Sequence, residues 1–266
     1  LDKANKDRKE KKFDVRVRNE ETPPNHLWAF DLESKKETRL TSGTDYTVSD
    51  VTFSPNSQWV GFRGTQNNRY KRTVTESSSY SDLYLMEAAT GTVERLTTNE
   101  DISESALRFS PDNSIIAFSA DDDFQYFRNG RIYVRSTTDK GGKWKKLGEG
   151  FDGDVGVGFW SQDSRMIYFN EGFRTTNQVF SVSTQTGKVT QLTEMQGMVS
   201  AAQDEDTKVI TVNYIDPKNP ANLYFVPRVE RIQNRGSWKQ LTNSNPQAEE
   251  FLLGDVEAVQ LKSTDG

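Results

Sequence analysis

The stretch Leu83-Tyr84-Leu85-Met86 is followed, a dozen residues after its start, by Arg95-Leu96-Thr97. This pairing of a short apolar run with a Leu-Thr ending occurs five times, and the ending recurs at intervals of 45 to 56 residues. The other copies are Leu27–Phe30 with Arg39–Thr41, Ile132–Val134 with the decayed Lys146-Leu147-Gly148, Val179–Val182 with Gln191–Thr193, and Leu223–Val226 with Gln240–Thr242. Glycine-containing turns such as Thr90-Gly91 separate the two halves, which predicts a hairpin in each copy.

A second motif precedes each hairpin. Phe53-Ser54-Pro55-Asn56 runs into Trp59–Phe62, and Phe109-Ser110-Pro111-Asp112 runs into Ile115–Phe118, with weaker copies starting at Trp160 and Asp204. Proline and the Asn or Asp side chain favour a tight turn between two strands. Four short strands in a repeat of roughly 40 to 50 residues are typical of a propeller blade, because one such sheet buries its faces only by stacking on others. The sequence therefore predicts an all-β fold, a β-propeller with about five four-stranded antiparallel blades.

Composition limits the classes of function. The chain has 266 residues, a net charge of −5 with acids and bases interspersed, and no cysteine, so neither nucleic acid nor a membrane surface is an expected partner. No apolar run approaches the ~20 residues that span a bilayer, and nothing in the sequence indicates a metal or a cofactor. The first residue is Leu1 rather than Met, which leaves a removed leader possible. We expect a periplasmic or secreted bacterial protein rather than a cytoplasmic one.

The chain divides into three segments by composition. Residues 1–25 are rich in Lys, Arg, Asp and Glu, which predicts a charged linker, with an edge strand possible at Phe13–Val17. Residues 26–255 carry the predicted blades. In residues 251–266, Phe251–Leu253 and Val256–Leu261 alternate like strands, and residues 256–266 are predicted to be a junction toward a domain outside this sequence.

The connectors between the second and third strands of each repeat vary most, and by propeller geometry they emerge on one face. We therefore look for function there. Candidates to contact a substrate or another domain are Asp121, Asp123, Tyr126, Arg128, Glu171 and Arg174. Solvated, turn-forming charge is the alternative interpretation of all six. A calcium loop at Asp121–Asp123 is disfavoured, because consecutive aspartates lack the alternate spacing of a ligating loop.

The C-terminal sequence from Glu257 to Gly266, EAVQLKSTDG, follows repeats of Ser-Pro-Asp and Leu-Thr. It resembles the junction at which serine peptidases of the prolyl oligopeptidase family pass from their propeller into an α/β-hydrolase domain. The opening, a Lys- and Asp-rich stretch before His26-Leu27-Trp28, is similar to the propeller of the bacterial dipeptidyl- and acylaminoacyl-peptidase branch. The resemblance covers the whole chain and implies an incomplete disc of seven or eight blades.

Catalytic residues of such a peptidase are absent from this sequence. A Ser-His-Asp triad needs a base, and the only histidine is His26, at a strand edge. No Gly-x-Ser-x-Gly nucleophile elbow occurs. The resemblance therefore implies a non-catalytic propeller that admits short peptides and positions them for a hydrolase domain, on the same polypeptide or a separate chain.

Two other functions remain open at this point. The repeats are shared with TolB-like propellers, so a stand-alone protein-binding propeller is one alternative. The segment Thr137–Trp144 approximates the Asp-box turn of sialidase-type propellers, but it occurs once and has Lys143 where Ser or Thr is usual. A glycosidase would also need placed carboxylates, so a sialidase-like enzyme is the weaker alternative.

Overall fold

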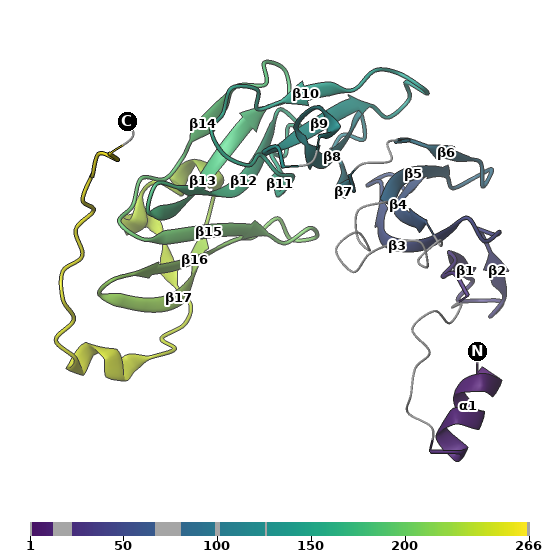
Figure 1. Cartoon of the computed structure of the whole chain (residues 1–266), viewed down its shortest axis with the longest axis horizontal. Helices are drawn as coiled ribbons and strands as arrows, with labels where there is room; N and C mark the ends of the chain where they lie inside the picture. Colours follow the sequence, from purple (N-terminus) through teal and green to yellow (C-terminus); the bar gives the residue numbers. More distant parts are fainter. Residues whose placement is uncertain (1, 13–22, 67–80, 99–101, 126, 265–266) are drawn as a thin grey trace. The chain divides into compact units, whose positions relative to one another are not determined.

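The computed structural model describes residues 2–12, 23–66, 81–98, 102–125 and 127–264 (Figure 1). Two compact units are present, one of residues 1–108 and 123–126 and the other of residues 109–122 and 127–266. Each unit is described by itself. Nearly all of the regular structure is antiparallel sheet, as the repeats predict.

Two four-stranded sheets and one eight-stranded sheet together contain four groups of four strands in the order expected of propeller blades. Blade 1 comprises β3 (Tyr46–Phe53), β4 (Trp59–Gln66), β5 (Ser81–Glu87) and β6 (Val93–Arg95), and blade 2 comprises β7 (Ser105–Phe109), β8 (Ile115–Asp121), β9 (Gly130–Ser136) and β10 (Lys145–Leu147). Blade 3 comprises β11 (Phe159–Trp160), β12 (Met166–Phe173), β13 (Thr176–Ser183) and β14 (Val189–Gln191). Blade 4 comprises β15 (Met198–Gln203), β16 (Ile210–Asp216), β17 (Asn219–Val226) and β18 (Lys239–Gln240). A single parallel pairing of Asn177 with Met198 joins blades 3 and 4.

The first of the five predicted repeats is a hairpin only. Strands β1 (Trp28–Phe30) and β2 (Glu37–Arg39) pair with each other and correspond to the third and fourth strands of a blade. The described residues therefore form four complete blades and the outer half of a further one. Trp28 and Phe30 on this hairpin are exposed.

The turn after the first strand has the same side-chain hydrogen bonds in three blades. In blade 2 the Ser110 hydroxyl donates to Asp112 Oδ1 (2.6 Å), and Ser110 Oγ accepts from the Ile115 amide (2.9 Å). Blades 1 and 3 repeat both bonds with Ser54 and Asn56 and with Ser161 and Asp163. Short polar side chains can satisfy the backbone of a turn in this way, which is why the motif recurs.

The threonine of each Leu-Thr ending ties the fourth strand to the third. Thr193 Oγ1 accepts from the Val179 amide (2.9 Å) and donates to Gln178 Oε1 (2.7 Å). We call this pair of bonds the threonine latch. Equivalent latches join Thr41 with Leu27 and His26, Thr97 with Leu83 and Asp82, and Thr242 with Leu223 and Asn222. Blade 2 lacks the threonine, because Gly148 follows Leu147.

Apolar side chains of neighbouring blades in the second unit pack into two clusters. Between blades 2 and 3, Ala117, Ile132 and Leu147 pack with Trp160 and Ile167, and between blades 3 and 4, Phe159, Tyr168 and Val179 pack with Val199 and Val212. In the first unit, Phe62 stacks on Tyr84 with ring centroids 5.3 Å apart. Stacking of this kind supplies the buried surface that an isolated four-stranded sheet lacks.

The ends of the chain differ from the expectation. Asp2–Glu10 forms helix α1 within the segment predicted to be a linker, whereas Phe13–Val17 lies outside the described residues. The alternation of Phe251–Leu253 and Val256–Leu261 predicts strands, but the structure has no strand there and the apolar side chains are exposed. Alternation alone forms no strand, because a strand also needs a partner for its backbone.

Four short 3₁₀ helices complete the described elements: η2 (Asp122–Phe124), η3 (Val229–Arg231), η4 (Arg235–Ser237) and η5 (Pro246–Glu250). The segment resembling an Asp-box forms the hairpin between β9 and β10, where Trp144 packs edge-on against Phe118. Of the helices in the described residues, none combines the length and the apolar content needed to cross a bilayer.

Candidate functional site

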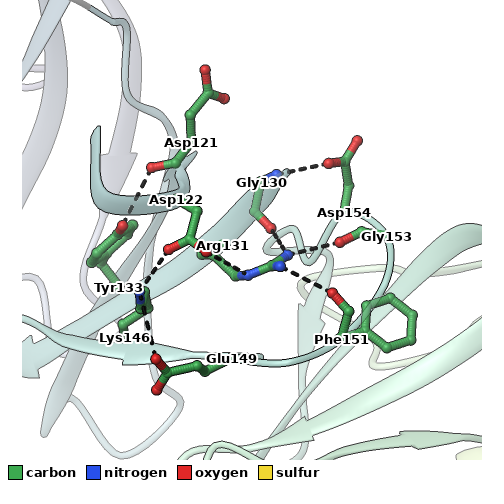
Figure 2. A network of polar contacts seen from close by, with 10 residues as sticks. All are labelled: Asp121, Asp122, Gly130, Arg131, Tyr133, Lys146, Glu149, Phe151, Gly153 and Asp154. Carbon is green, nitrogen blue, oxygen red and sulfur yellow. Dashed lines mark hydrogen bonds and ion pairs between the residues drawn. The ribbon is translucent and has the colours of Figure 1, made fainter. Parts of the chain in front are cut away.

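Two kinds of segment emerge at the same end of each blade in the second unit. One is the connector from the second strand to the third, and the other is the segment that leads from the fourth strand to the next blade. They share an end because the second and fourth strands of an antiparallel sheet run in the same direction. In blade 2 these are the connector from Asp121 to Gly130 and the segment from Gly148 to Gly158. Figure 2 shows the polar contacts that join them.

Arg131 is at the centre of this network and is almost fully buried. Its Nη1 donates to the carbonyl oxygens of Gly130 (2.8 Å) and Gly153 (2.7 Å), and its Nη2 donates to the carbonyl oxygen of Phe151 (2.9 Å). The planar guanidinium presents several donors in a fixed fork. One side chain therefore holds the segment after β10 against the start of β9.

Asp122 balances the buried guanidinium. Arg131 Nε lies 3.5 Å from Asp122 Oδ2, and Lys146 Nζ lies 2.6 Å from Asp122 Oδ1. Lys146 is also 3.9 Å from Glu149, whose side chain is exposed. A charge taken out of water needs such partners, so Asp122, Arg131 and Lys146 form one fixed ionic group from β9, β10 and the connector.

Asp121 and Asp154 bring two carboxylates to the same end of the blade. Asp154 Oδ1 accepts from the Gly130 amide (2.7 Å), and the Tyr133 hydroxyl donates to the backbone oxygen of Asp121 (3.3 Å). Partial burial, and secondarily the negative charge of Asp154, raise the pKa of the Asp121 carboxyl above its ordinary value. A nearby cation would favour the ionised form of Asp121 and would be bound in return.

Glu171 of β12 approaches the same segment from blade 3. A Cβ atom built on Gly153 would be 3.2 Å from Glu171 Oε1 and 2.9 Å from the Phe151 ring. The Glu171 carboxylate therefore lies beside the glycine whose carbonyl group Arg131 binds. Of the predicted candidates, Asp121 thus joins the network through its backbone oxygen, and Glu171 lies beside Gly153 of the same segment.

The other candidates are exposed or lie outside the described residues. Arg174 lies over the ring of Phe173, 5.2 Å from its centroid, and is exposed. Arg128 is exposed on the connector, and Asp123 is an exposed residue of η2 with a positive φ of 52°. Tyr126 lies outside the described residues.

Sequence analysis did not select Arg131, Lys146 or Asp154, whereas Asp122 belongs to the acidic run Asp121–Asp123 that was predicted on this connector. A signal for Arg131 was present in the repeat: it occupies the position that His26, Asp82, Gln178 and Asn222 hold in the other copies, immediately before the apolar run. It stands in the one repeat whose ending has lost its threonine. Arg131 therefore replaces the polar residue of a threonine latch in the one described blade that lacks the latch threonine.

His26 has a structural partner. Its Nδ1 lies 3.2 Å from Thr41 Oγ1, which is the threonine latch of the first hairpin. Burial, followed by the positive charge of Arg39, lowers the pKa of His26. Among the residues that the structure describes, no group of three or more His, Cys, Asp or Glu side chains could hold a metal ion.

Solved structures of other proteins share this fold. Oligogalacturonate lyase from Vibrio parahaemolyticus has a TM-score of 0.59 at 14% identity, over 82% of this chain and 60% of that one. A putative dipeptidyl aminopeptidase IV from Bacteroides ovatus has a TM-score of 0.54 at 14% identity, over 86% of this chain and 34% of that one. A putative TolB from Agrobacterium tumefaciens has a TM-score of 0.52 at 17% identity, over 81% of this chain and 68% of that one.

These likenesses show that the chain has a β-propeller fold. It spans about a third of the peptidase's length and 60% of the lyase's, and it spans about half of TolB from Acinetobacter baumannii. No protein-family model matches the sequence, and none of the curated proteins compared with it is significantly similar.

Proposed function

We propose that this chain is the non-catalytic propeller of a serine peptidase of the prolyl oligopeptidase type, which limits access to short peptides and positions them for an α/β-hydrolase domain. The observation that carries the proposal is the order of parts: four complete blades are followed by the junction-like sequence Glu257–Gly266. The fold shared with the putative dipeptidyl aminopeptidase IV supports it. A periplasmic or secreted location is part of the same proposal.

The carboxylates of Asp121, Asp154 and Glu171 are the groups that we assign to the substrate. An α-ammonium group with three donors suits carboxylates held on a rigid support. The buried Arg131, fixed to the Gly153 and Phe151 carbonyl groups, provides that support. Asp122 is held by Arg131 and Lys146 and is left out of this assignment. Asp154 accepts from the Gly130 amide through Oδ1, so it would offer its Oδ2 to the peptide.

The test uses the protein isolated from its source with an antibody against this sequence. Treatment with a fluorophosphonate probe should label a serine on a polypeptide that contains the chain or co-purifies with it, and the 266-residue chain alone should stay unlabelled. An isolated protein of 30.2 kDa that carries no label and no labelled partner would overturn the proposal.

A second experiment tests the carboxylates in the labelled enzyme. Glu171→Gln should raise KM about tenfold for peptides with a free amino terminus, since a charge-assisted hydrogen bond contributes ~1.5 to 3 kcal/mol, and should leave KM for N-acylated peptides unchanged. Asp152→Asn, at an exposed position of the neighbouring segment, is the control. Equal effects of Glu171→Gln on both substrates would remove Glu171 from the binding role.

A stand-alone protein-binding propeller is the second candidate, supported by the likeness to the putative TolB, of which the chain spans 68%. An unlabelled 30.2 kDa protein that co-purifies in a fixed ratio with one non-hydrolase protein would favour this function.

A further inference from the structure

Asn129 precedes Gly130 at the end of the connector into β9, and this is the only Asn-Gly pair in the sequence. The backbone nitrogen that follows an asparagine can attack the side-chain carbonyl carbon of that asparagine and close a five-membered ring. Glycine as the following residue favours this reaction, because no Cβ atom shields the nitrogen. Of all the asparagines in the chain, Asn129 therefore has the following residue best suited to the reaction.

The Gly130 amide is held on a carboxylate. It donates to Asp154 Oδ1 over 2.7 Å, so its proton already points at a base (Figure 2). The Gly130 carbonyl oxygen accepts from Arg131 Nη1 (2.8 Å) and from the Val155 amide (2.9 Å). These bonds keep Gly130 in place beside Asp154, and the nitrogen that would attack and the group that would take its proton are thus brought together by the fold.

The side chain of Asn129 can approach this nitrogen. Asn129 is exposed and belongs to no strand. The backbone bond from the Asp122 amide to the Asn129 carbonyl oxygen (2.9 Å) leaves the side chain able to rotate about its Cα–Cβ bond. Rotamers of exposed side chains interchange far faster than a covalent bond forms, so the reactive rotamer is sampled many times before the ring closes.

From this arrangement we propose that Asn129 is a modification site that deamidates through a cyclic imide, with Asp154 as the base. The Gly130 nitrogen bonds to the Asn129 Cγ atom while its proton passes to Asp154 Oδ1. The bond between Cγ and Nδ2 then breaks, and Asp154 returns the proton to the departing nitrogen, which leaves as ammonia. Water opens the imide at one of its two carbonyl groups. The product is aspartate, or isoaspartate, in which the backbone runs through the side-chain methylene group.

The modification changes the charge at this end of blade 2. Either product adds a carboxylate to a connector that already carries Asp121, Asp122 and Asp123, and neighbouring like charges disfavour one another. Isoaspartate also lengthens the backbone immediately before β9, which moves the Gly130 amide relative to Asp154. A protein molecule that has reacted therefore differs from a new one at the candidate site.

The test follows Asn129 in the intact protein during incubation at neutral and mildly alkaline pH. Chymotrypsin releases the peptide of residues 128–133, and mass spectrometry measures the fraction in which the amide has become an acid and separates aspartate from isoaspartate. We expect steady conversion at Asn129, with isoaspartate among the products. Asn243, an exposed asparagine that precedes Ser244, is the internal reference and should stay intact over the same period.

Asp154→Asn is the decisive variant, because it keeps an oxygen that can accept from the Gly130 amide but is not a base. It should slow the conversion of Asn129 at least about tenfold, since a positioned general base contributes ~10² to 10⁴. Glu149→Gln removes an exposed carboxylate from the same segment and should leave the rate unchanged. If Asp154 only restrains the segment, Asp154→Asn should instead leave the rate unchanged or increase it, and either outcome would overturn the proposal.

The pH profile distinguishes base catalysis from a change in mobility. In a synthetic peptide of residues 128–133, the rate should rise with the hydroxide concentration. In the protein it should rise less steeply near neutral pH, because Asp154 takes the proton in place of hydroxide. The same profile in protein and peptide would contradict the role of Asp154, and an Asn129 that stays intact as long as Asn243 does would remove the modification site altogether.

Discussion

The threonine latch of blade 3 gives the sharpest test of how the repeat stabilises the fold. Thr193 is 1% exposed, and Thr193→Val keeps its shape while removing both hydrogen bonds. The Val179 amide then has no acceptor, which costs ~1 to 3 kcal/mol, and the bond to Gln178 is lost at about 1 kcal/mol. Gln178 Oε1 keeps its bond from the Met195 amide (3.3 Å). The added methyl group returns ~0.8 kcal/mol, so we expect a net cost of about 2 kcal/mol.

Native-state hydrogen exchange measures this cost at the residue concerned. The Val179 amide should exchange about 30-fold faster in Thr193→Val, because 1.4 kcal/mol is about tenfold, and the urea midpoint should fall. Thr242→Val is the matched control: Thr242 makes the same two bonds with Leu223 and Asn222, but there the amide bond is exposed to water. We expect a cost below about 1 kcal/mol for Thr242→Val. Equal costs at the two sites would refute the reasoning, since burial would then not decide the value of the latch.

Three further predictions concern the second unit. Burial alone would raise the pKa of Asp112, but hydrogen bonds from the neighbouring serines outweigh it and lower the pKa to about 2. The ionised Asp112 carboxylate therefore stabilises the fold above about pH 4, and this stabilisation is lost towards pH 2. The difference in unfolding free energy between wild type and Asp112→Asn should shrink over that range. In urea unfolding, Gly148→Ala should destabilise the protein by about 1 to 3 kcal/mol more than Gly141→Ala does. Both glycines have positive φ, but only at Gly148 would the new Cβ meet a side chain, that of Val155 at 2.7 Å. Similar losses of unfolding free energy in the two variants would contradict this. Arg131→Lys should cost about 2 to 3 kcal/mol and should make residues 149–154 more sensitive to limited proteolysis, which an unchanged digestion pattern would disprove.

The blade pattern was predictable because it depends on local chemistry. Ser110 and Asp112 form their turn with atoms a few residues away, and Leu-Thr endings recur because each threonine bonds the strand beside it. The residues that form the turn and the threonine that bonds the third strand therefore recur in the sequence wherever the fold repeats these two features. The position of Asp121 and Glu171 at the same end of the blades was predictable for the same reason, since strand direction fixes which connectors share a face.

The contents of the candidate site were predictable only in part. Asp154 and Lys146 have no distinguishing feature in the sequence, and Asp122 was predicted only as part of the acidic run Asp121–Asp123. The three side chains form a network only when β9, β10 and the segment after β10 come together around Arg131. The strands expected at Phe251–Leu253 and Val256–Leu261 did not form, because alternation shows which side chains could be buried and does not supply a partner strand.

The sequence by itself determined the order of the strands within a blade and the turns between them, because these depend on short-range hydrogen bonds and on a periodic apolar pattern. The single histidine and the lack of a nucleophile elbow are likewise read from the residue types present. Only the tertiary structure decided which polar residues meet and which apolar face stays open. Asn170 and Asn213 occupy equivalent register positions, paired with Val179 and Leu223. Asn170 binds the backbone of Ala201 in the neighbouring blade, whereas Asn213 is exposed. The difference between them depends on whether another blade packs against the face that carries the asparagine. Such packing is a contact between segments that are distant in the sequence, so neither segment alone reveals it.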